Sequence, residues 1–229
     1  MTKSPSPSAR SANGSSAEQT RLALIQAALR LFGTKGYDGT STREIAAAAK
    51  ANIGSIAYHF GGKDGLRAAC AQHIVDTVRG VAAKVLAPGE DAGPLTPDAA
   101  HKRIETALDT MVSFIIARPE AGEFVQFLLR ELAQPTPALD IIYNGVFVPV
   151  HSQLCRVWEA ATGEPAESER TRITVFTLIG QVVYFRIGRL AVMRRMGWDN
   201  IGAQEAGAIV SVVKDNLAAI IASRGKEKP

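Results

Sequence analysis

Apolar residues recur every three or four positions along most of this chain, which is the period of a helix that buries one face. Strict alternation of apolar and polar residues, typical of a half-buried strand, is scarce. The pattern predicts helices over about 18–34, 41–50, 52–60, 63–86, 97–117, 120–133, 138–161, 167–196 and 203–222. We therefore expect an all-α protein.

Specific residues mark several of the predicted helix ends. Ser41 and Glu44 have the spacing of a capping box, in which each side chain accepts from the other residue's backbone N–H. Pro149 predicts a kink within the helix over 138–161. The stretch 87–97 is dense in proline, glycine and acidic residues, which predicts a loop between a small N-terminal unit and a larger helical bundle.

The N-terminal unit has the outline of a helix-turn-helix. It holds three short helices, and a tight turn joins the second to the third. In this motif the last helix enters the DNA major groove. Within that helix, NIGSIAYHF, Ile56 and Phe60 are four residues apart and can share the face toward the core. The other positions are left outside, where small residues let the backbone lie deep in a groove.

The outward positions carry groups that suit DNA. Ser55 can contact a base edge, whereas Tyr58 and His59 can donate to phosphate oxygens. A packed or capping histidine is the alternative interpretation of His59. The starts of the flanking helices also favour an anion. We predict the following DNA-binding residues: Thr42, Arg43, Ile53, Gly54, Ser55, Ala57, Tyr58, His59 and Lys63.

Residues 18–66 resemble the DNA-binding domain of TetR-type transcriptional repressors. The resemblance rests on three stretches in order: LFGTKGYDGTSTREIAAAA, SIAYHF and GGKDGL. It implies that a homodimer presents two recognition helices to a pseudo-palindromic double-stranded DNA operator. Many members of the family have an aromatic residue where this chain has Ala57. One common groove contact is therefore absent, which gives DNA shape a larger share in recognition.

The remainder of the chain resembles the CecR-like branch of that family. The stretches that carry this resemblance are LLRELAQPTPALDIIYNGVFVPV and GQVVYFRIGRL followed by MGW. The resemblance implies that the last two long helices of each subunit form a four-helix dimer interface. The pattern agrees, because 175–190 is apolar on more than one face, unlike an ordinary surface helix.

Polar residues within the apolar bundle are candidates to contact a small-molecule effector, because such pockets are mostly apolar with a few placed polar groups. The tentative ligand-binding residues are Arg130, Glu131, Tyr143, Gln181, Tyr184 and Arg186. Structural ion pairs and buried tyrosines are the alternative interpretation of each of them. As a group, we expect at least one to touch the effector.

These patterns divide the chain into five segments. The predicted order is a disordered basic arm at 1–16, the TetR-type helix-turn-helix domain at 17–64, a connecting helix at 65–86, a helical effector-binding and dimerisation domain at 87–223, and a flexible tail at 224–229.

Composition and charge change this picture little. The 229 residues include 26 basic and 22 acidic ones, and the net charge of +4 does not indicate nucleic-acid binding by itself. Cys70 and Cys155 form no CxxC pair, which fits a reducing cytoplasm. The N-terminus lacks the apolar run of a signal peptide. Polar and charged residues interrupt 173–196, so we expect a cytoplasmic protein without a membrane segment.

We find no motif of an enzyme, a metal site or a cofactor site. His151, Cys155 and Glu159 are spaced by four on one predicted helix face, as metal ligands can be, but an ordinary helix face beside Pro149 is the preferred interpretation. The stretch GGK at 61–63 lacks the earlier glycine and the following hydroxyl residue of a phosphate loop. No nucleophile, base and orienting group occur together.

The sequence therefore predicts a ligand-responsive transcriptional regulator. The expected mechanism is a homodimeric repressor whose operator affinity falls when an effector favours a state with mismatched recognition helices. Two alternatives stay open: a constitutive DNA-binding regulator without an effector, and a helical protein-interaction module.

Overall fold

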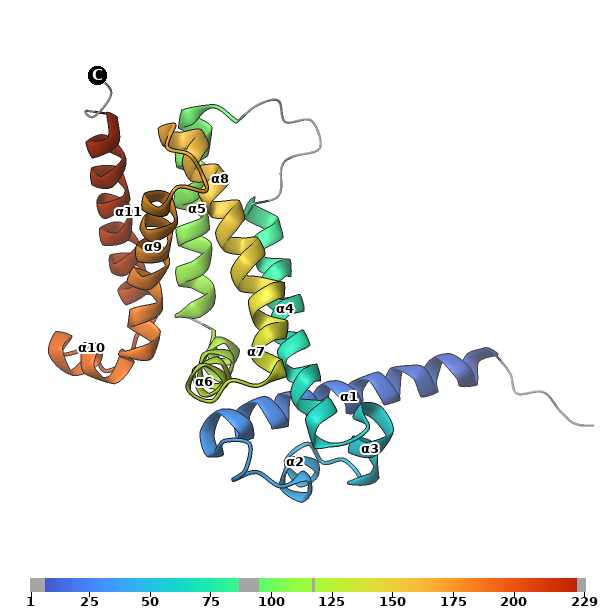
Figure 1. Cartoon of the computed structure of the whole chain (residues 1–229). Coiled ribbons are helices and arrows are strands. Elements are labelled where there is room, and N and C mark those ends of the chain that lie inside the picture. Colours follow the sequence, from blue (N-terminus) through green and yellow to red (C-terminus); the bar gives the residue numbers. More distant parts are fainter. Residues whose placement is uncertain (1–6, 87–94, 117, 226–229) are drawn as a thin grey trace, which may run out of the picture. The chain divides into compact units, whose positions relative to one another are not determined.

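A computed structural model describes residues 7–86, 95–116 and 118–225 of the chain (Figure 1). All regular secondary structure in these residues is helical, which confirms the predicted fold class. The contacts divide the chain into two compact units. The first comprises Met1–Ile74 and Gln126–Ile142, and the second comprises Val75–Val125 and Tyr143–Pro229.

The first unit combines the N-terminal helices with a segment from the middle of the chain. Its core is apolar and fully buried, and includes Leu24, Ile25, Leu29, Ile45, Ile56, Leu66 and Phe127. Its elements are α1 (Pro7–Lys35), α2 (Thr42–Ala48), α3 (Gly54–Phe60), the first half of α4 (Lys63–Leu86), the second half of α6 (Pro119–Ala133) and α7 (Pro137–Ile142).

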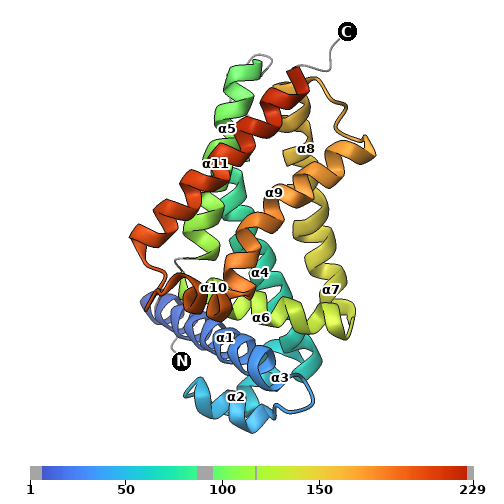
Figure 2. The same cartoon turned by 90° about the vertical axis from the view of Figure 1, so that its left-hand side faces the viewer.

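The second unit is a helical bundle. Its face toward the viewer in Figure 2 is formed by α9 and α11, with α5 and α8 behind them. Trp158 is the largest buried side chain, and its indole N–H donates to Glu164 at 2.8 Å. Besides parts of α4 and α6, the elements are α5 (Pro97–Ile115), η1 (Tyr143–Phe147), α8 (Val148–Thr162), α9 (Glu169–Ile187), α10 (Arg189–Met196) and α11 (Ala203–Gly225).

The N-terminal helix is longer than predicted. It begins at Pro7, within the segment 1–16 that the sequence predicted to be disordered. A proline in the first turn removes no helix hydrogen bond, and no other proline follows before Lys35. Residues 1–6 of the predicted arm and 226–229 of the predicted tail lie outside the described residues.

The predicted helix over 138–161 is divided by a π-helical segment, η1, which ends two residues before Pro149. The proline has no N–H to donate to the carbonyl of Gly145, so the preceding backbone widens. A Cβ on Gly145 would lie 2.6 Å from Cγ2 of Val75, so η1 approaches α4 in a way that only glycine permits.

The predicted helix over 167–196 is two helices, α9 and α10, which meet at an angle of 78°. Gly188 lies at the break, and its N–H donates to the carbonyl of Tyr184 at 2.7 Å. A Cβ at Gly188 would lie 3.2 Å from Cζ of the Tyr184 ring. The absence of a side chain at Gly188 therefore lets this ring pack against the bend.

Candidate nucleic-acid interface

The start of α2 is fixed by the predicted capping box, which is confirmed. The hydroxyl of Ser41 accepts from the backbone N–H of Glu44 at 3.2 Å, and Glu44 Oε2 accepts from the N–H of Ser41 at 2.8 Å. Lys35 donates to the other oxygen of Glu44 at 2.7 Å. This cation, and then the Ser41 donors, lower the pKa of Glu44 to about 2. Arg43 follows the cap on the exposed surface.

Short-range contacts also delimit α3. The side-chain oxygen of Asn52 accepts from the N–H of Gly54 at 2.8 Å, and Gly61 ends the helix with φ of 71°. Ile56 is buried and Phe60 partly buried, so both face inward as predicted. The guanidinium of Arg21 lies 5.7 Å from the Phe60 ring centroid.

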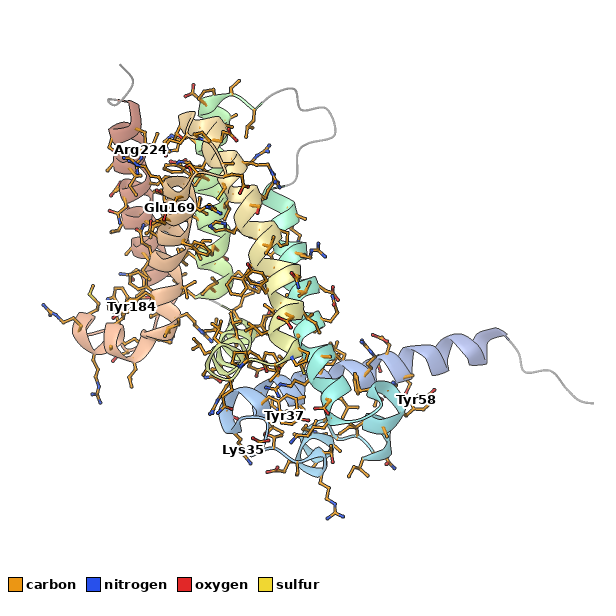
Figure 3. The ribbon with its side chains drawn as sticks, viewed as in Figure 1. Lys35, Tyr37, Tyr58, Glu169, Tyr184 and Arg224 are labelled. Atoms are coloured by element: carbon orange, nitrogen blue, oxygen red, sulfur yellow. The ribbon has the colours of Figure 1, made fainter. Side chains whose placement is uncertain are left out.

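The outer face of α3 combines small residues with one large aromatic. Gly54 and Ala57 are exposed, Ile53 is 47% exposed, and Ser55 and His59 are half-buried. Tyr58 is 83% exposed and projects away from the helix, with its ring edge to face with His59 at 4.9 Å (Figure 3). The small side chains allow close approach to a flat or grooved surface, and Tyr58 offers a hydroxyl beside them.

The start of α4 packs tightly against the end of α3. A Cβ on Gly65 would lie 1.8 Å from the carbonyl oxygen of Phe60, so glycine is required in this part of the GGKDGL motif. Lys63, the first residue of α4, is held by Tyr37. Its ammonium donates to the carbonyl of Tyr37 at 2.6 Å and lies 4.0 Å from the centroid of the Tyr37 ring. Lys63 is therefore placed by the fold, with donors left for a further partner.

Two of the six predicted ligand-binding residues lie in the first unit. Arg130 donates to the carbonyls of Gly33 and Thr34 at 3.3 and 3.0 Å, which caps the C-terminal end of α1. Glu131 is 1% exposed and accepts from Arg67 at 2.7 Å. Both therefore make structural contacts, as in the alternative interpretation, and they belong to a different unit from the other four candidates.

The remaining four candidates lie in the second unit without gathering around one described hollow. Tyr143 is exposed on η1, and Tyr184 is 60% exposed against the bend after α9. Gln181 accepts from the side chain of Asn216 at 2.8 Å, which ties α9 to α11. Arg186 donates to the carbonyl of Pro119 at 3.5 Å. Burial and then the charge of Arg189 lower the pKa of Arg186.

The described part of the second unit has a hollow of about 300 Å³ that none of the six candidates lines. Its lining residues are Val81, Asp109, Thr110, Ser113, Phe114 and Arg118. Most belong to α5, where the polar positions look like those of any amphipathic helix. Only packing distinguishes them, so no pattern in the sequence indicates this hollow.

The spacing of His151, Cys155 and Glu159 does not produce a metal cluster within the described residues, which contain no group of three or more such ligands. The His151 ring stacks on Phe176 at 4.0 Å, and its Nε2 lies 3.1 Å from the carbonyl oxygen of Arg172. Since a carbonyl can only accept, this nitrogen carries the proton.

Two regions of the chain match models of known protein families. Residues 24–70 match bacterial regulatory proteins of the tetR family. Residues 100–224 match the C-terminal domain of the HTH-type transcriptional dual regulator CecR.

Two curated relatives extend this likeness over much of the chain. The HTH-type transcriptional dual regulator CecR of Shigella flexneri is 34% identical over 210 residues, which cover 89% of this chain and 92% of the relative. The HTH-type transcriptional regulatory protein RaaS of Mycobacterium tuberculosis is 31% identical over 166 residues, covering 72% and 70%.

Solved structures share the fold at low sequence identity. A putative transcriptional regulator from Pseudomonas aeruginosa PAO1 has a TM-score of 0.65 and 16% identity, covering 92% of this chain and 95% of that one. AibR, in complex with isovaleryl coenzyme A and operator DNA, has a TM-score of 0.61 and 17% identity, covering 85% and 96%. The solved structures show the fold, and the family matches together with the CecR relative show that the chain belongs to the TetR family of DNA-binding transcriptional regulators and carries a CecR-type C-terminal domain.

Proposed function

We propose that the chain acts in the cytoplasm as a homodimeric repressor, which binds a pseudo-palindromic operator through α3 and is released by a small-molecule effector. The main support for a DNA-binding surface comes from the outer face of α3. Its small residues permit deep entry into a groove, and the side chain of Tyr58 is 83% exposed.

The proposed DNA contacts divide by chemistry. Gly54 and Ala57 let the backbone approach the bases, while Ser55 contacts a base edge. Tyr58 and His59 donate to phosphates, which fixes the position of the protein without reading sequence. Thr42, Arg43, Ile53 and Lys63 complete the surface at its edges. Because few of these groups read bases, DNA shape contributes to operator choice.

The proposed dimer explains the apolar surface of the second unit. Ile173, Phe176 and Ile187 are exposed on α9, and Val212 on α11. An exposed apolar face of this kind marks a surface that binds another protein or a membrane. By length and composition Ala203–Arg224 could also cross a membrane, but a TetR-type regulator acts on DNA, so we assign this surface to a second copy. Light scattering in detergent-free buffer should give a dimer, and a monomer at micromolar concentration would contradict this.

The effector is proposed to bind in the second unit. AibR was solved with an acyl thioester and DNA, so a protein of this fold binds such a ligand. In this chain, Tyr143, Gln181, Tyr184 and Arg186 remain the proposed contacts. Substitution of Gln181 or Tyr184 by alanine should weaken effector-induced release without changing operator affinity. An unchanged effector response in both variants would count against this site.

The test of the whole proposal begins with genome-wide footprinting, which identifies the operator. Fluorescence anisotropy then measures affinity for this operator and for random DNA across salt concentrations. A repressor of this type binds its operator far more tightly than random DNA and loses affinity steeply with salt. An affinity that no effector changes would leave a constitutive regulator, and an absence of specific binding would leave a protein-interaction module.

A further inference from the structure

A buried carboxylate from α6 completes the first unit. Glu131 is 1% exposed, although it lies far along the chain from the helix-turn-helix. Burial of a charge is costly unless it is paired and its oxygens are hydrogen-bonded. Both conditions are met: Oε1 accepts from Nε of Arg67 at 2.7 Å, and Oε2 accepts from the hydroxyl of Thr136 at 2.5 Å.

The contact continues from Arg67 to the aromatic ring of Tyr37. The guanidinium of Arg67 lies 4.4 Å from the ring centroid, and the ammonium of Lys63 lies 4.0 Å from the same centroid. The hydroxyl of Tyr37 donates to Asp64. Burial and this hydrogen bond raise the pKa of Tyr37 to about 12, so the hydroxyl keeps its proton at neutral pH. Lys63, Asp64 and Arg67, at the start of α4, therefore all contact the side chain of Tyr37, which is labelled in Figure 3.

Two cations against one ring repel each other unless acidic groups offset their charge. Asp64 is hydrogen-bonded to the ring's hydroxyl, and Glu131 is ion-paired with Arg67. Glu131 has a further effect, because its rigid, buried carboxylate also fixes where the guanidinium lies. Removal of its charge would leave Arg67 free to move and increase the repulsion on Lys63.

We propose that Glu131 is a positioning residue for DNA binding, which fixes Lys63 against Tyr37 by way of Arg67 and so presents the Lys63 ammonium to the DNA backbone. The inference rests on the proposed DNA-binding surface, of which Lys63 is a member. It makes one phosphate contact depend on a residue outside the helix-turn-helix sequence.

The test uses the full-length dimer with Glu131→Gln, which keeps the shape of the side chain and removes its charge. Operator affinity should fall about five- to tenfold. The slope of log affinity against log salt should fall by about two, because each subunit loses one placed phosphate contact. A purely structural role would lower the melting temperature and leave this slope unchanged, which would overturn the proposal. Glu120→Gln, at an exposed carboxylate of the same helix, should change neither operator affinity nor the salt slope.

A double-mutant cycle tests the route of the effect. In a Lys63→Met background, Glu131→Gln should cause little further loss of affinity, because the contact on which it acts is already absent. Two fully additive losses would overturn the proposal. If Lys63→Met changes neither affinity nor slope while Arg43→Met lowers both, Lys63 is no phosphate contact. The inference then fails and DNA binding through α2 and α3 stands.

A milder variant keeps the test decisive if Glu131→Gln does not fold. Thr136→Val removes one of the two hydrogen bonds to the carboxylate and leaves its charge. A smaller fall of the salt slope, at a melting temperature that keeps the protein folded in the assay, would support the proposal. A folded Thr136→Val protein with the full wild-type slope and affinity would contradict it.

Discussion

Single side chains on α3 differ in what they offer to DNA. Tyr58 is the most exposed large hydrophobic side chain of the described residues, and its hydroxyl has no hydrogen-bond partner among them. Ser55, one turn earlier, is half-buried and has a smaller reach. We therefore propose that Tyr58 contacts the DNA backbone and that Ser55 makes the base contact.

Tyr58→Phe removes only the hydroxyl and keeps the ring. We expect affinity for the operator and for random DNA to fall by the same factor, about fivefold, because a phosphate contact carries no sequence information. Anisotropy titrations with both DNAs measure this. Ser55→Ala is the matched variant. If it lowers affinity for the operator alone, Ser55 contacts a base. If Tyr58→Phe lowers affinity for the operator alone, the assignment of Tyr58 to a phosphate is contradicted.

Glu44 makes the stability of the first unit depend on pH. Lys35, followed by the Ser41 donors, lowers the pKa of Glu44 from its ordinary 4.5 to about 2 in the folded protein. A depressed carboxyl pKa stabilises the fold above the unfolded value, and this contribution is lost as the pH falls from about 4.5 toward 2. Urea unfolding should therefore show wild type more stable than Glu44→Gln at neutral pH, with the difference shrinking over that interval. A difference that is constant with pH would contradict this.

Whole helices are positioned by a few close approaches of backbone to backbone. The first turns of α4 approach the last carbonyl of α3 at Gly65, and the end of α1 approaches α6 at Gly33, where a Cβ would lie 3.0 Å from Cβ of Gln126. The contact at Gly65 helps to hold α3, whose seven residues are too few to form a stable helix alone.

Gly65→Ala tests the α3–α4 junction against Gly80→Ala in the same helix. A methyl at Gly65 overlaps the Phe60 carbonyl, whereas nothing lies within 4 Å of a Cβ at Gly80. Gly65→Ala should destabilise the protein by about 1–3 kcal/mol and lower operator affinity. Gly80→Ala should be neutral or stabilise it by up to about 1 kcal/mol, because alanine favours the helix. Denaturant unfolding compares the two, and equal effects would show that the close approach does not matter.

At the scale of the whole molecule, the proposed regulator needs a second copy. Ile173, Phe176 and Ile187 of α9 and Val212 of α11 are exposed among the residues that the structure describes, and α11 is apolar along most of its length. Two recognition helices, held one DNA turn apart, bind a pseudo-palindrome far more tightly than one.

Val212→Glu introduces a charge into the proposed interface. Light scattering should show the dimer shifted to monomer at micromolar concentration, and operator affinity should fall at least tenfold because the two half-sites are no longer bound together. Lys102→Glu reverses a charge at an exposed position of α5 and should leave the dimer intact. A Val212→Glu protein that stays dimeric would place the interface elsewhere.

Local sequence determined the helical class, the capping box of Ser41 and Glu44, and the inward faces of Ile56 and Phe60. Each of these depends on residues three or four apart, whose spacing decides the outcome whatever surrounds them. The family resemblance reached the same domain from its motifs, and the comparisons confirmed that family.

Only the tertiary structure decided which distant residues meet. Arg67 and Glu131 are 64 positions apart, and nothing in either local sequence shows that Glu131 packs in the first unit and pairs with Arg67. The partner of Lys63, the carbonyl of Tyr37, was hidden for the same reason, because the two residues are 26 positions apart. Periodicity states which face of a helix is buried, but the partner of that face is chosen by the packing of the whole chain.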